Sequence, residues 1–268
     1  METTRLRADL NYEFQLLRAA IASAERSAKV PCCPDWTADQ LAHHVAQTYL
    51  HKVECIRLGA FPENWPPEGI DPDPVAALDE QFAALTAAFD AHDPADPAAT
   101  WHDPDQTVGF WIRRMAHESV IHRVDAEQVA GIELAPIDED IALDGIDEFL
   151  TLFIGFFSSK YPEEYGSALR DPDPRPLAVS AGGSTWTLTA SETGVEVART
   201  ALGHAATAAT AATAATATSA EPAAVTVSGS PVDVLLWLWV RTDDAAVRIE
   251  GDDRAVAQLK ALRKEATQ

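Results

Sequence analysis

The chain has 268 residues, with 20 Lys and Arg against 42 Asp and Glu, so its formal net charge is −22. This composition argues against nucleic acid and against an anionic membrane surface as partners, because both are bound by clustered basic side chains. The sequence shows neither an apolar stretch of the ~20 residues that span a bilayer nor a secretory leader, and three cysteines do not suggest a disulfide framework. We therefore expect a cytoplasmic protein of about two domains.

Residues 1–160 carry the spacing of amphipathic helices. Apolar side chains recur every three or four positions from Leu6 to Ile21, which predicts a first helix. A similar pattern predicts a second helix, which is capped by Thr37 or Asp35 and ends near residue 58. Further helices are predicted over 75–89, 108–129 and 139–157, and Asp138 caps the last of them. Pro- and Asp-rich loops separate these segments. We expect an antiparallel helical bundle.

The period of the apolar residues changes to two after Pro174. Alternation predicts strands at 186–190, 195–198, 225–228 and 247–251, with an apolar helix over 231–241 and a closing helix over 254–262. Residues 175–268 thus form a small α+β domain. An Ala/Thr-rich tract at 201–220 interrupts it, and we interpret this tract as a mobile insertion without a catalytic role.

Two of the predicted helices carry polar residues on the face that should be buried. Successive helical residues turn by about 100°, so His44 lies about 60° from Leu41 and about 100° from Val45, on the apolar side. By the same arithmetic His43 lies about 200° from Leu41 and faces outward. His44 is therefore the inward histidine of the second helix.

The fourth helix repeats this pattern. Glu118 and His122 are one turn apart and Asp125 follows one turn later, on a face with apolar ends. A buried carboxylate needs a cation or a hydrogen-bond network, so we expect one or the other here. His44, Glu118 and His122 would supply three ligands and leave a fourth position open, as in catalytic zinc sites, and Asp125 would hold a histidine N–H. A surface Glu–His pair and an ordinary core histidine are the alternatives that spacing leaves open.

Three segments then resemble one family. Residues 30–37 (VPCCPDWT) with 41–45 (LAHHV), the long segment 107–127, and residues 141–150 (IALDGIDEFL) are similar to signatures of the mycothiol-dependent maleylpyruvate isomerase family. The C-terminal half, notably 235–241 (LLWLWVR), is similar to that family's sterol-carrier-like (SCP2-like) domain. Nearly the whole chain takes part, apart from the Ala/Thr tract.

The resemblance implies a DinB-like four-helix bundle with a smaller C-terminal α+β domain. It implies a divalent metal, usually zinc, held by a histidine of the second helix and a Glu-x-x-x-His pair, which correspond to His44, Glu118 and His122. It also implies an arginine of the C-terminal domain over the site, for which Arg241 is the best match. A helix-end arginine interacting with the helix dipole is the alternative for Arg241.

The resemblance further implies mycothiol as the thiol cosubstrate. A metal-bound thiolate would attack a small electrophile, giving cis–trans isomerisation or S-transfer, and Arg241 would suit a carboxylated substrate. Two other functions remain open at this point: a module that binds a small apolar ligand, and a metal-dependent hydrolase with Asp125 as the base. We expect a monomer or a homodimer that binds neither nucleic acid nor membrane.

Overall fold

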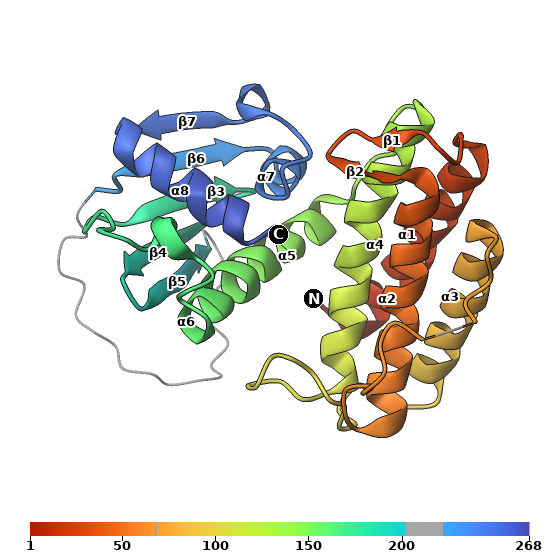
Figure 1. Ribbon diagram of the computed structural model, residues 1–268. Coiled ribbons are helices and arrows are strands. Elements are labelled where there is room, and N and C mark those ends of the chain that lie inside the picture. Colours follow the sequence, from red (N-terminus) through yellow and green to blue (C-terminus); the bar gives the residue numbers. More distant parts are fainter. Residues whose placement is uncertain (68, 202–221, 268) are drawn as a thin grey trace. The chain divides into compact units, whose positions relative to one another are not determined.

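The computed structural model describes residues 1–67, 69–201 and 222–267, so the Ala/Thr tract, apart from its first residue, lies outside the described part of the chain. The chain divides into two compact units, Met1–Ile137 and Asp138–Gln268 (Figure 1). Within the described residues, none of the helices combines the length and the apolar character needed to cross a membrane.

The N-terminal unit is a bundle of four helices that lie side by side (Figure 1). They are α1 (Thr3–Ser23), α2 (Ala38–Leu58), α3 (Pro74–Asp90) and α4 (Val108–Ala130). The apolar stripe of α1 is buried along its whole length, and α1 packs mainly against α4 while α2 packs mainly against α3. The predicted four-helix bundle is therefore confirmed.

The start of α2 is fixed by its capping residue. The Thr37 hydroxyl accepts a hydrogen bond from the Gln40 amide N–H, and the Gln40 side chain accepts one from the Thr37 N–H, which is a complete capping box. Of the two predicted caps, Thr37 is the one used. The segment before it forms a short antiparallel pair, β1 (Lys29–Val30) and β2 (Cys33–Thr37), which the sequence analysis did not predict. This pair brings Trp36 beside α2.

The C-terminal unit has the predicted α+β organisation. Five strands form a sheet in the order β5-β4-β3-β6-β7, in which β3 and β6 are parallel and the other neighbours are antiparallel. The strands are β3 (Leu177–Ala181), β4 (Ser184–Ser191), β5 (Gly194–Ala201), β6 (Val225–Gly229) and β7 (Arg248–Gly251). The helices α7 (Pro231–Leu238) and α8 (Asp253–Glu265) belong to this unit, and α8 lies across the sheet in Figure 1. The strand β3 was not predicted, because four of its five residues are buried and no alternation marks it.

The predicted fifth helix lies in the C-terminal unit. It consists of α5 (Glu139–Glu148), capped by Asp138, a π-helical segment (Phe149–Phe156) and α6 (Phe157–Lys160). Its first part packs against α7 and its π-helical part against β5. The sequence predicted a domain boundary near residue 160, whereas the first compact unit ends at Ile137. Apolar spacing shows that a helix has a buried face but not which partner covers that face.

The apolar helix predicted over 231–241 is shorter in the structure. It ends at Leu238, and Val240 then takes a left-handed backbone conformation with φ of 62°. The Arg241 N–H returns to the Leu236 carbonyl at 2.8 Å, closing the end of the helix. Arg241 therefore follows the helix rather than ending it.

Candidate metal centre

Three side chains from α2 and α4 converge at one point of the N-terminal unit. One ligand atom from each of His44, Glu118 and His122 lies within 4.8 Å of the others. The Glu118 Oε1 atom is 3.4 Å from His44 Nε2 and 3.2 Å from His122 Nε2. Two imidazole nitrogens and one carboxylate oxygen therefore face a common centre, as the helical spacing predicted.

Two neighbours fix the orientation of this triad. The Asp125 Oδ2 atom lies 3.0 Å from His122 Nδ1, so the Nδ1–H can donate to it while Nε2 faces Glu118. Arg114 donates from Nη2 to the other oxygen of Glu118, Oε2, at 2.5 Å. Both neighbours are buried, and they hold one ligand each in place.

The charges of the centre are strongly coupled. Burial raises the pKa of Glu118, but the charges of His122 and Arg114 and hydrogen bonds from both histidines outweigh it, and the pKa lies well below its ordinary value. Burial lowers the pKa of His122, while the Glu118 charge and the Asp125 hydrogen bond raise it to about 9. Without a metal, His122 and Glu118 therefore form an ion pair at neutral pH.

The donor set fits a divalent ion. Two histidines and one carboxylate are the ligands of a catalytic zinc site, which keeps a further position open. The side chain of His44 is 37% exposed, whereas those of Glu118 and His122 are 14% and 9% exposed, so the centre opens on the His44 side. The Trp36 ring packs on His44 with centroids 4.6 Å apart, covering part of that opening.

Arg241, the remaining predicted catalytic residue, lies in the C-terminal unit. Its guanidinium donates to the Trp239 carbonyl at 2.7 Å, and Trp239 in turn packs edge-on against Phe149 and Phe153. This anchors the backbone before the arginine. The placement of Arg241 over the metal centre stays a prediction.

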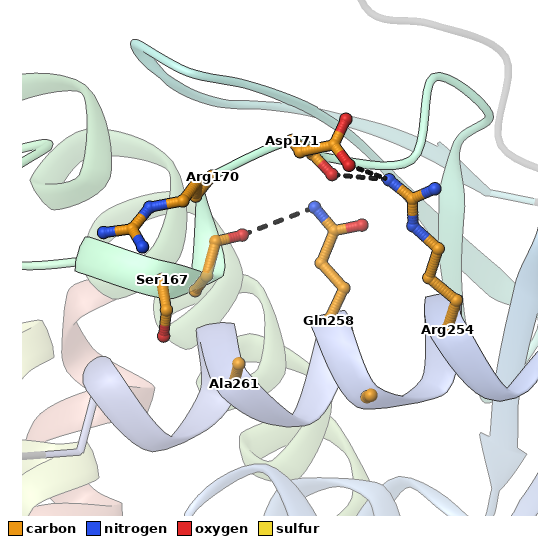
Figure 2. A pocket seen from close by; sticks show the side chains of 8 residues that line it. Ser167, Arg170, Asp171, Arg254, Gln258 and Ala261 are labelled. Carbon is orange, nitrogen blue, oxygen red and sulfur yellow. Dashed lines mark hydrogen bonds and ion pairs between the residues drawn. The ribbon is translucent and has the colours of Figure 1, made fainter.

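A pocket of about 270 Å³ lies between α8 and the 3₁₀ turn Gly166–Ala168 of the C-terminal unit (Figure 2). Its polar groups are largely engaged with adjacent segments. Arg254 donates to the Asp171 backbone and carboxylate at 2.7 and 2.9 Å, and Gln258 donates to the Ala168 carbonyl. These contacts connect α8 to the turn, so we assign the residues around the pocket a structural role.

Sequence reasoning missed two residues near the centre. Trp36 lies in the segment 30–37 that resembles the family, but nothing in its spacing indicates the contact with His44, because that contact depends on the β1–β2 pair. Lys52 stands two turns after His44 on α2, and about 80° of rotation separates them. The helical rotation that places His44 on the buried side of α2 therefore indicates the same side for Lys52.

Comparison with known proteins gives one family match, and it lies within the N-terminal unit. Residues 8–127 match the model of the mycothiol maleylpyruvate isomerase N-terminal domain, and the stretch includes all three ligands and Asp125. No curated protein matches the chain significantly. A solved structure of a UbiJ-SCP2 ubiquinone synthesis protein matches at 20% identity over 50% of this chain and 96% of its own, with a TM-score of 0.27. The N-terminal unit is therefore similar to the mycothiol maleylpyruvate isomerase N-terminal domain, and the match covers less than half of the chain.

Proposed function

We propose that this protein is a metal-dependent and mycothiol-dependent enzyme that uses a thiol to convert a small electrophile, by cis–trans isomerisation or by S-transfer. The observation that carries the proposal is the convergence of His44, Glu118 and His122 on one centre. The similarity of the N-terminal unit to the mycothiol maleylpyruvate isomerase N-terminal domain supports the thiol and the reaction class. Zinc is the metal that this donor set suits best.

A divalent ion bound there would lower the pKa of a coordinated thiol, so that the thiolate forms at neutral pH. The chain's own residues prepare the centre for this. Asp125 keeps His122 in the tautomer whose Nε2 faces inward, and Arg114 leaves Glu118 one free oxygen. Trp36 narrows access of water on the exposed side of His44. Arg241 would bind a carboxylate of the substrate.

The geometry bears on the two competing functions. A hydrolase would need a general base, and the carboxylate of Asp125 is fully buried against His122 instead of facing the open side. A pure binding module would not need two histidines and a carboxylate aligned on one face. Both observations favour the thiol-dependent enzyme.

The test is metal binding by the purified full chain, followed by mass spectrometry and calorimetric zinc titration. We expect about one ion per chain, lost in His44→Ala and retained in the matched control His43→Ala. The control is apt because His43 is adjacent and its ring nitrogens lie against the Asp39 and Asp71 carbonyls, outside the triad. Equal metal content in both variants would contradict the proposal. Turnover of electrophiles without added thiol would favour the hydrolase.

A further inference from the structure

A lysine without a carboxylate partner lies close to the metal centre. Lys52 is half-buried on α2, and within the described residues no carboxylate lies within ion-pair distance of its Nζ. The ammonium instead stands over the Trp111 ring at 4.6 Å from the centroid and contacts His51 Nδ1 at 3.2 Å. Trp111 and Arg114 come two turns and one turn before Glu118 on α4, so Lys52 and Arg114 belong to one side of the centre.

The electrostatic environment of Lys52 supports this placement. Burial lowers the pKa of Lys52 to about 8, while the charge of Glu118 raises it and that of Arg114 lowers it. A chain with an excess of acidic residues has many carboxylates to pair with a lysine. Here Arg114 already holds Glu118, and the Lys52 ammonium contacts the Trp111 ring and the His51 ring nitrogen instead.

A metal ion would make the charges around the centre predominantly positive. Arg114 and Lys52 balance Glu118 and Asp125 in number, so a divalent ion held by the triad would leave a positive excess. A partly desolvated ammonium attracts an anion more strongly than one in water does, because the local dielectric constant is lower.

We propose that Lys52 is a specificity-determining residue: with the charge of Arg114 behind it, its ammonium binds an oxyanion group of the molecule that the metal centre engages. The inference rests on the proposed function for the identity of that molecule, but the anion subsite is testable by itself. Carboxylate and phosphate share the required chemistry. The subsite lies in the N-terminal unit and is separate from the role assigned to Arg241.

The test titrates the full chain with malonate and, separately, with inorganic phosphate at constant ionic strength, by calorimetry. We expect saturable binding that weakens at least about tenfold in Lys52→Met, as loss of a charged hydrogen bond predicts. Lys52→Arg should keep most of the affinity, since it keeps the charge over Trp111. Lys264→Met, which removes an exposed lysine of α8, should bind like the wild type.

Zinc titration of Lys52→Met separates the two proposals. Wild-type-like zinc affinity shows that the variant is folded and that the triad is intact. Anion binding that depends on Lys52 in a protein that takes up no metal would sustain this inference and contradict the proposed function. Equal anion binding by the wild type and Lys52→Met, or no saturable binding of either anion, would overturn the proposed anion subsite at Lys52. The stronger of the two anions identifies the group as a carboxylate or a phosphate.

Discussion

Replacing Arg123 by Met should be among the most destabilising single changes in the N-terminal unit. The guanidinium is fully buried and donates to Glu13 Oε2 and Glu127 Oε2, each at 2.7 Å, and to the Ala135 carbonyl at 2.9 Å. It therefore ties α1, α4 and the segment after α4 together. Methionine fills similar space but leaves two buried carboxylates facing each other.

The expected loss of unfolding free energy at pH 7 is about 3–5 kcal/mol, the usual cost of removing one partner from a buried ion pair. The pKa of Glu13 is already raised by burial, which outweighs Arg123, and the charge of Glu127 raises it further. Without Arg123 it should rise more. The folded variant then binds more protons than the folded wild type does. The difference in unfolding free energy between the two proteins should therefore shrink as the pH falls from 7 towards 4.5, the pKa of Glu13 in the unfolded chain.

Urea unfolding followed by far-UV circular dichroism at pH 7 and pH 5 measures both effects. Arg18→Met is the matched control: Arg18 pairs with Asp79 at 2.5 Å, but the two side chains are 40% and 43% exposed, so at most about 1 kcal/mol is expected. The triple variant with Met at 123 and Gln at 13 and 127 should regain much of the stability. A loss below about 1 kcal/mol for Arg123→Met, or a deficit that does not change with pH, would refute the reasoning.

Three further outcomes are expected. Arg114→Leu should weaken zinc binding about 10- to 100-fold, because Glu118 loses the partner that holds it. Replacement of the exposed Arg57 by Leu is the control. If calorimetry gives the two variants equal zinc affinities, Arg114 does not position Glu118. Val240→Gly should raise the unfolding free energy by about 0.5–1 kcal/mol, because relief of a left-handed strain of ~1–2 kcal/mol exceeds the cost of the added chain entropy. The control Val247→Gly, at an extended φ of −129°, should lower the unfolding free energy. Thermal unfolding measures both changes, and a lower midpoint for Val240→Gly would contradict the strain. Thr37→Ala should cost about 1 kcal/mol by removing the capping box, and faster amide exchange confined to the first turn of α2 should accompany it; unchanged exchange there would contradict the cap's role.

The convergence of three side chains on one point could be predicted from the sequence, because it follows from helical rotation. His44, Glu118 and His122 each fall on the buried side of an amphipathic helix, and a straight helix preserves that relation whatever its packing partner. Thr37 could be predicted as a cap for a similar reason, since the capping box is a local pattern. Asp125 also followed from its spacing of three residues from His122.

The rest depends on tertiary packing, which spacing does not encode. The helix that starts at Glu139 has an apolar face like those of the bundle, yet α7 and β5 cover it. The end of α7 depends on Val240 adopting a conformation that β-branched residues rarely take, so no propensity marks it. The role proposed for Lys52 depends on the packing of its ammonium against Trp111 of α4, a contact that the spacing along α2 does not show.

The way in which Glu118 is shared has a consequence for metal selectivity. Arg114 occupies Oε2, so a cation in the centre meets one carboxylate oxygen and two imidazole nitrogens. Calcium requires about 6–8 oxygen ligands and often a bidentate carboxylate, and magnesium prefers oxygen ligands in near-octahedral geometry. By engaging the second oxygen, the arginine would make this centre a poor host for calcium and magnesium and would favour a borderline metal such as zinc.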